Sequence, residues 1–151
     1  MHLYFETQVN QPISRVWTGF NQALFKELNP PFPPVKIIRF DGCLQGDVVH
    51  IELNFFVFRQ DWISLIVEQQ TQVNEIFFVD QGTKLPFFLR YWQHRHRLLR
   101  TPTDVTGEQT IIIDDITFRT PFLLTDYLLY PILWLQFAYR KPIYRRWFSR
   151  L

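Results

Sequence analysis

The first part of the chain shows one strand pattern followed by two helical patterns. Residues 2–9 alternate between apolar and polar positions, which predicts a short strand, and residues 10–12 interrupt the alternation with a proline. Apolar residues recur at helical spacing in residues 13–20 and again in 21–28, so we predict two short helices. The proline-rich residues 29–34 cannot extend them, because proline lacks a backbone N–H and moves the preceding residue out of the helical region.

Strand patterns then dominate the chain as far as Arg119. The predicted strands span residues 35–40, 47–58, 60–70, 74–80, 89–101 and 108–119. In the second of these, alternation places one apolar set on a single face: Val49, Ile51, Leu53, Phe55 and Val57. Turns are expected at Gln81-Gly82 and Thr106-Gly107. Short connections between consecutive strands predict antiparallel pairing, and the length of the strands predicts strong curvature.

The last part of the chain predicts one long helix. Residues 121–139 are apolar apart from Asp126 and Gln136, which is long enough for a membrane span. Those two polar side chains and Pro131 are costly in lipid, so we predict a buried helix instead, with Pro131 near its first turn and a kink at Pro142. Four apolar residues share one face of this helix: Leu133, Phe137, Tyr144 and Phe148.

Together these patterns predict an α+β fold. We expect a curved antiparallel sheet of about seven strands wrapped around the long C-terminal helix, with two short helices after the first strand. No linker or repeat divides the chain, so residues 1–151 are predicted to form a single domain. Because a strongly curved sheet leaves more room than one helix fills, an internal cavity between sheet and helix is expected.

Composition narrows the class of protein. Hydrophobic residues make up 47% and aromatic residues 18% of the chain, which excludes a disordered chain. A net charge of +2 gives no argument for nucleic-acid binding. The one cysteine, Cys43, excludes an internal disulfide framework and a cysteine-rich zinc site, and it is expected to be inert. Since residues 1–10 resemble structure rather than a leader, we predict a cytoplasmic protein.

Two neighbouring strands carry the candidate chemistry. The side chains expected to point inwards are Trp92, His94, His96 and Leu98 on one strand, and Ile112, Asp114, Ile116 and Phe118 on the next. A buried carboxylate needs a partner, and one of the two histidines is the obvious one. Such a His–Asp pair can hold the strands together, bind a ligand or transfer a proton. The same three residues have the spacing of metal ligands, but nothing else supports a metal, so neither metal nor cofactor is predicted.

The end of the chain is basic and aromatic. Its cations, with no acid among them, are Arg140, Lys141, Arg145, Arg146 and Arg150. They are expected either to form the solvated end of a helix, where cations suit the helix dipole, or to make weak contact with an anionic membrane surface.

Several short motifs in order resemble one known superfamily. They are Phe5 to Trp17, Phe78 to Phe87, Tyr91 to His96 (Tyr-Trp-Gln-His-Arg-His), Asp114 to Pro121, and Phe137 to Arg140. This series resembles the START-like, birch-pollen-allergen-like superfamily (SRPBCC), and most closely its bacterial ligand-binding, cell-division-inhibitor-like branch. The sequence departs from that pattern at Leu85, where glycine is usual, and at Phe118, where tyrosine is usual. The resemblance implies a helix-grip fold with a hydrophobic cavity, and some members are polyketide cyclases or aromatases.

We therefore expect a protein that binds a small hydrophobic molecule, lipid-like or aromatic and polyketide-like, rather than an enzyme. Besides the inward residues of the two central strands, the expected ligand contacts are Leu53, Phe55, Leu133 and Phe137. One alternative is a cyclase, dehydratase or hydrolase that uses the His–Asp pair in the same cavity. Another is an adaptor that contacts a membrane or a protein through the basic C-terminal helix. No oligomeric state is predicted.

Overall fold

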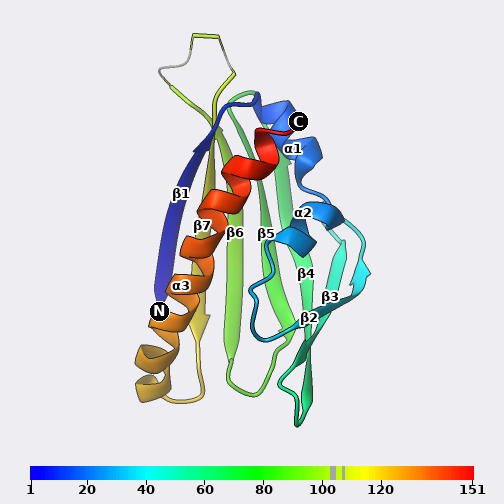
Figure 1. Cartoon of the computed structure of the whole chain (residues 1–151), viewed down its shortest axis with the longest axis vertical. Helices are drawn as coiled ribbons and strands as arrows, with labels where there is room; N and C mark the ends of the chain where they lie inside the picture. The colour runs from blue at the N-terminus through cyan, green and yellow to red at the C-terminus, as the bar shows by residue number, and fades with distance from the viewer. Residues whose placement is uncertain (103–104, 107) are drawn as a thin grey trace.

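The computed structural model of the protein describes residues 1–102, 105–106 and 108–151. Within them the chain forms seven strands and three helices (Figure 1). In chain order these are β1 (His2–Val9), α1 (Ile13–Gly19), α2 (Gln22–Glu27), β2 (Val35–Phe40), β3 (Val48–Asn54), β4 (Arg59–Thr71), β5 (Glu75–Lys84), β6 (Tyr91–Arg100), β7 (Thr110–Arg119) and α3 (Leu123–Phe148).

All seven strands belong to one antiparallel sheet, in the order β1-β7-β6-β5-β4-β3-β2. Strands β2 to β7 pair with their neighbours in the sequence, whereas β1 closes the far edge by pairing with β7. Helix α3 lies across one face of the sheet near β1 and β7, and α1 and α2 cover the same face beside the end of α3 (Figure 1). The predicted α+β helix-grip architecture is confirmed.

The core consists of two apolar clusters on the covered face of the sheet. The first joins α1 and α2 to the last turns of α3 and includes Val16, Leu24, Leu98, Ile112, Tyr144 and Phe148. The second lies under the first half of α3 and includes Phe5, Trp92, Ile116, Phe118, Leu133 and Phe137. Along β6 and β7, the residues between these clusters are His94, His96 and Asp114. The interior is therefore polar at the point where its two halves meet.

Two expected strand boundaries were wrong. The strand predicted over 47–58 ends at Asn54, whose side-chain oxygen accepts from the backbone N–H of Phe56 and starts a turn, with Phe56 at a φ of 69°. Val57, expected on the apolar face, lies in this turn and is 88% exposed.

Gly82, expected in a turn, lies inside β5. A Cβ atom there would come within 2.4 Å of Leu85 Cδ2 and 3.2 Å of Trp92 Cβ, so the position needs glycine for close packing rather than for a turn. The other expected turn includes Gly107, which lies outside the described residues.

Helix α3 also departs from expectation. It begins at Leu123, so Pro131 lies well inside the helix and not in its first turn, and the helix continues through Pro142 to Phe148. The helix is buried along one side only, whereas residues such as Leu124, Leu128 and Leu135 are exposed. Among the described residues, no helix is both long enough and apolar enough to cross a membrane.

Candidate ligand-binding site

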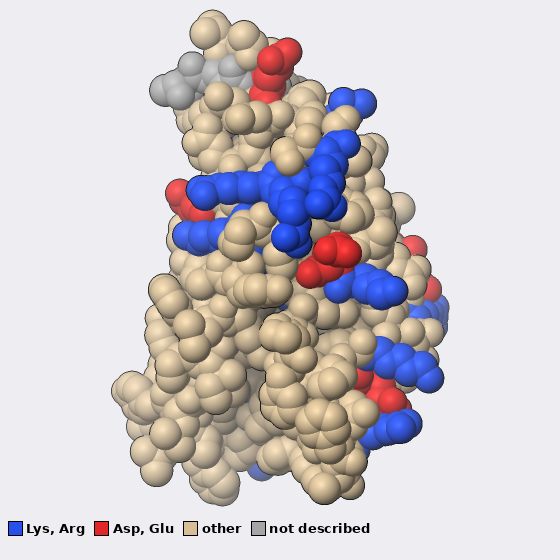
Figure 2. All heavy atoms as spheres, in the orientation of Figure 1, with Lys and Arg blue, Asp and Glu red and all other residues tan. Residues whose placement is uncertain are grey.

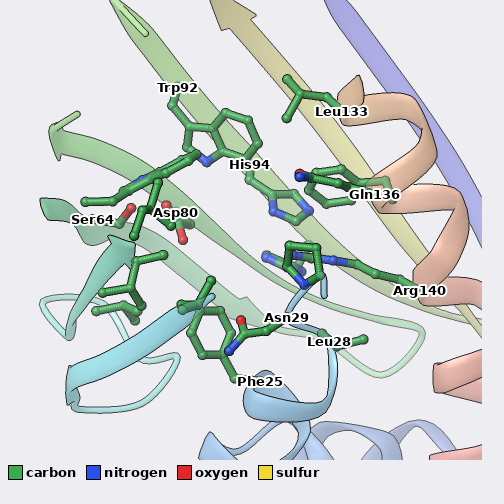
Figure 3. A pocket seen from close by; sticks show the side chains of 18 of the residues that line it. Phe25, Leu28, Asn29, Ser64, Asp80, Trp92, His94, Leu133, Gln136 and Arg140 are labelled. Carbon is green, nitrogen blue, oxygen red and sulfur yellow. The ribbon is translucent and has the colours of Figure 1, made fainter. Parts of the chain in front are cut away.

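A cavity of about 350 Å³ lies between the sheet and α3 (Figure 3). That volume is within the range of about 300–1,000 Å³ typical of small-molecule sites. Most of its wall is apolar and comes from α2, strands β2 to β6 and α3: Leu24, Phe25, Leu28, Val49, Ile51, Leu53, Phe55, Trp62, Ile66, Trp92, Leu133 and Phe137. Figure 2 shows the surface hollowed in the lower part of the molecule, between α3 and the segment that joins α2 to β2.

A cluster of polar side chains is buried behind one wall of the cavity. His94 Nε2 lies 2.9 Å from Asp114 Oδ1, and the Tyr144 hydroxyl donates to the same oxygen at 3.3 Å. His96 Nδ1 lies 3.5 Å from that oxygen without forming a hydrogen bond, and the Arg140 guanidinium lies 4.0 Å away. The register explains the arrangement, because His96 faces Asp114 across β6 and β7, and His94 is two residues along on the same face.

Burial keeps these histidines neutral. It lowers the pKa of both His94 and His96 well below the usual 6.5, and the positive charge of Arg140 lowers both further. A neutral imidazole carries one proton, so the short contact assigns that proton to Nε2 of His94, which donates to Asp114. Burial also raises the pKa of Tyr144 well above 10, so its hydroxyl stays a donor. One oxygen of Asp114 therefore accepts two hydrogen bonds and lies near a guanidinium.

The same cluster could supply metal ligands. One donor atom from each of His94, His96 and Asp114 lies within 4.8 Å of the others, and this donor set suits zinc. However, Arg140 lies 4.0 Å from the Asp114 oxygen, where its charge would repel a bound cation. The donor chemistry of the cluster therefore suits hydrogen bonding better than a divalent metal.

A second polar group, Asp80, faces the cavity from β5. Asp80 lies opposite His94 in the β5–β6 register and so points to the same side of the sheet (Figure 3). Its Oδ1 atom is buried and has no hydrogen-bond partner among the described residues. Burial raises the pKa of Asp80 to about 6, although a hydrogen bond with Ser64 and the charge of Arg140 act in the opposite direction.

The thiol of Cys43 also lines the cavity. Its burial is the main cause that raises its pKa to about 12, and the negative charges of Asp47 and Asp80 raise it further.

Sequence reasoning missed the two charged residues that line this cavity, Asp80 and Arg140. Asp80 stands within the Phe78 to Phe87 motif, and its pairing with the strand that carries His94 would have shown that it points inwards. Arg140 was expected on the exposed basic tail, yet its guanidinium lies 4.1 Å above the Phe137 ring and lines the cavity. Helical spacing could have found it, because Arg140 lies three residues after Phe137 and four before Tyr144, which were expected on the inward face of the helix.

The predicted contact residues divide into two groups. Those that line the cavity are Leu53, Phe55, Trp92, His94, His96, Leu133 and Phe137. Those that do not line it are Leu98, Ile112, Asp114, Ile116 and Phe118. The reason is the place of α3, which packs close to β1 and β7 and fills the space over β7, so the cavity lies over β2 to β6 instead.

Comparisons with known proteins identify the fold. No protein-family model and no curated protein matches the sequence. Among solved structures, an uncharacterised protein from Bacillus thuringiensis is 14% identical, covers 99% of both chains and has a TM-score of 0.68. Norcoclaurine synthase from Thalictrum flavum is 13% identical over 87% of this chain and 82% of its own, with a TM-score of 0.62. An aromatase/cyclase from Streptomyces is 17% identical over 81% of this chain and 69% of its own, with a TM-score of 0.54. The chain therefore has the helix-grip fold that these proteins share.

Proposed function

We propose that this protein binds a small, largely apolar molecule in the cavity between sheet and α3. The observation that carries the proposal is an apolar cavity of about 350 Å³ with a few buried polar groups on its wall. Norcoclaurine synthase, which shares the fold, has been crystallised with dopamine and hydroxybenzaldehyde, two small aromatic molecules. We further propose that the chain is one cytoplasmic domain of the START-like superfamily, in its bacterial cell-division-inhibitor-like branch.

Asp80 suggests what the polar end of the ligand carries. Its buried Oδ1 is an acceptor without a donor, and leaving such an atom unpaired costs about 1–3 kcal/mol. A hydroxyl or amino group on the ligand would remove that cost. His94, Ser64 and Arg140 surround the same region of the cavity and offer further hydrogen bonds (Figure 3). The ligand class that fits is an aromatic or aliphatic body bearing one hydrogen-bond donor.

The proposal can be tested with 2-naphthol, and with 2-methoxynaphthalene as the matched compound that lacks the donor. Isothermal titration should show one molecule of 2-naphthol bound per chain, about tenfold more tightly than the methyl ether, and Asp80→Ala should remove that difference. Leu53→Trp, which fills the cavity, should abolish binding, whereas Val73→Trp at an exposed turn should not. Binding of neither compound, or binding unaffected by Leu53→Trp in a folded variant, would contradict the proposal.

Proton transfer in the same cavity is the second candidate function. It is favoured by the position of Asp80, with a pKa of about 6, opposite the neutral His94 in the β5–β6 register, since both side chains line the cavity. If the protein is a cyclase or dehydratase, His94→Ala or Asp80→Asn should abolish turnover of an aromatic polyketide-like substrate while circular dichroism stays unchanged. Unfolding of both variants would instead indicate a structural role.

Membrane contact through the basic tail remains a weaker proposal. It rests on Lys141, Arg145 and Arg150, since Arg140 lines the cavity and Arg146 lies 3.9 Å from Glu27. Vesicle binding that is lost when Arg145 and Arg150 are both changed to glutamine, and that weakens with salt, would support it.

A further inference from the structure

One end of the molecule exposes apolar side chains from three separate connections. The β3–β4 turn, the β5–β6 loop and the segment leading into α3 all lie at the same end of the sheet (Figure 1). Their most prominent side chains are between 61% and 88% exposed: Phe56, Val57, Phe87, Phe122, Leu124 and Leu128. We refer to these six residues as the apolar end.

Contacts join the three connections into one surface. The rings of Phe58 and Phe87 lie 5.8 Å apart, which links the β3–β4 turn to the β5–β6 loop. Phe87 in turn shares a shallow depression with Phe122 and Leu128 at the start of α3. Figure 2 shows the lower left of the molecule largely without charged residues, in contrast to the blue cluster of Lys and Arg in its upper part. Continuous exposed apolar surface of this kind marks an interaction site.

Cations outnumber acids in the segments that form the apolar end. Residues 55–59, 84–90 and 119–135 contain the cations Arg59, Lys84, Arg90 and Arg119 but only one acid, Asp126. Asp126 is buried, and its carboxylate accepts from the backbone N–H of Thr120 at 2.6 Å. Glu52 and Asp61 form ion pairs with Arg59 and Lys84, so among the described residues Arg90 and Arg119 are the cations of these segments without an ion pair. The backbone N–H of Arg90 donates to the carbonyl oxygen of Arg119, which places the two residues side by side. An apolar surface bordered by arginines is complementary to an anionic lipid headgroup layer.

The apolar end also adjoins the cavity. Phe88, Leu129 and Ile132 line both the cavity and the shallow depression, so the two share a wall. Tyr127 and Trp134 are also exposed on α3, on its side toward β1, where Trp134 contacts Phe5, and such side chains favour the interface between water and lipid. A lipid layer placed against the apolar end would therefore lie beside the cavity mouth.

We propose that the apolar end docks onto the surface of an anionic lipid bilayer. The aromatic and aliphatic tips enter the boundary between headgroups and acyl chains, and Arg90 and Arg119 contact the phosphates. The contact is interfacial, in agreement with the lack of a membrane-spanning helix among the described residues. This inference uses the opposite end of the molecule from the basic tail, and it does not depend on what the cavity binds.

The test is co-sedimentation with vesicles of phosphatidylcholine, with and without phosphatidylserine. The wild-type protein should bind the vesicles that contain phosphatidylserine more tightly than those of phosphatidylcholine alone. Val57→Asp and Leu124→Asp should each lower the partition coefficient by about tenfold, since inserting one aliphatic side chain contributes at least that much. Val73→Asp, at an equally exposed position at the other end of the sheet, is the matched control and should bind like the wild type.

Two results would overturn the proposal. One is vesicle binding that is absent, or that persists in Val57→Asp and Leu124→Asp but is lost in Arg145→Gln, which would assign the contact to the basic tail. The other is a dimer in sedimentation velocity that Val57→Asp and Leu124→Asp dissociate without any vesicles, which would show that a second copy of the chain covers the apolar end.

Discussion

Asp114 is a carboxylate in the middle of an apolar interior, and its neighbours make that position tolerable. His94 and Tyr144 each donate a hydrogen bond, and Arg140 lies close enough to balance the charge. Without Asp114, the two donors would lose the acceptor that they share and the guanidinium would lose a neighbouring carboxyl group. Removing one member of such a buried pair costs more free energy than the intact pair contributes to stability, because the remaining charge stays buried without compensation.

Asp114→Ala should lower the free energy of unfolding by about 3–5 kcal/mol. Asp115, the next residue on β7, provides a close control because it points outwards, where His2 Nε2 lies 2.7 Å from its carboxylate. Asp115→Ala should change stability by less than about 1 kcal/mol, since exposed pairs contribute little. Urea unfolding followed by circular dichroism measures both, and equal effects of the two variants would contradict the role assigned to Asp114.

Asp80 gives a pH dependence of definite sign. Its pKa rises from 3.8 to about 6 on folding, so the folded state holds the proton more tightly, and stability falls as pH rises from about 4 to 6. The free energy of unfolding falls by about 2–3 kcal/mol over this range. The main cause is the cost of ionising a buried carboxyl group, which the hydrogen bond with Ser64 and the charge of Arg140 offset only in part. His94 and His96 act in the opposite direction, because their lowered pKa values remove stability as pH falls below 6.5.

Asp80→Asn isolates this contribution. The difference in unfolding free energy between variant and wild type should shift in favour of the variant between pH 4 and pH 6 and stay constant above about pH 7. Denaturant titrations of both proteins across that range measure the difference. A constant difference at all pH values would mean that Asp80 titrates normally in the folded protein.

At the scale of elements, alternation located the strands and the inward residues of β6, but it did not locate where strands end. Side-chain spacing reports which face a residue occupies, whereas the end of β3 depends on the hydrogen bond from Phe56 to the Asn54 side chain. The position of Gly82 was likewise not predicted by the sequence pattern. A glycine is expected in a turn, yet here it allows Leu85 and Trp92 to approach the backbone of β5. Such close approaches arise from tertiary packing, which the sequence pattern does not contain.

Gly82→Ala should therefore destabilise the protein by about 1–3 kcal/mol through overpacking. The nearest atom is the flexible end of Leu85, at 2.4 Å from the added Cβ, so Leu85→Ala should relieve much of the effect. A double-mutant cycle in thermal unfolding tests this coupling. Additive effects of the two changes would show that Leu85 is not what limits the space.

For the whole molecule, the order of elements was enough to predict a sheet wrapped around its last helix, with a cavity between them. The sequence also placed His94 and His96 on the inward face. It could not predict that α3 would pack toward β1 and β7, and this offset decides which residues line the cavity. As a result Asp80 and Arg140 belong to the site, while Ile116 and Phe118 belong to the solid part of the core.

A ligand in that cavity should stabilise the entire fold. At a free concentration of 2-naphthol one hundred times its dissociation constant, the stabilisation is about 2.7 kcal/mol. For a chain of this size, the melting temperature should rise by about 5–10 °C. Differential scanning calorimetry measures the shift, and Leu53→Trp should abolish it. An equal rise in that variant would indicate binding at the surface.

The pairing of β1 with β7 has a consequence for how the protein folds during its synthesis. The terminal amino group of Met1 donates to the carbonyl oxygen of Phe118 at 2.8 Å, and every residue of β1 faces a partner on the last strand. A nascent chain leaving the ribosome therefore carries β1 unpaired until β7 has also been translated. Pairing between strands so far apart in the sequence makes folding slow, and the unpaired β1 is a segment that chaperones can bind.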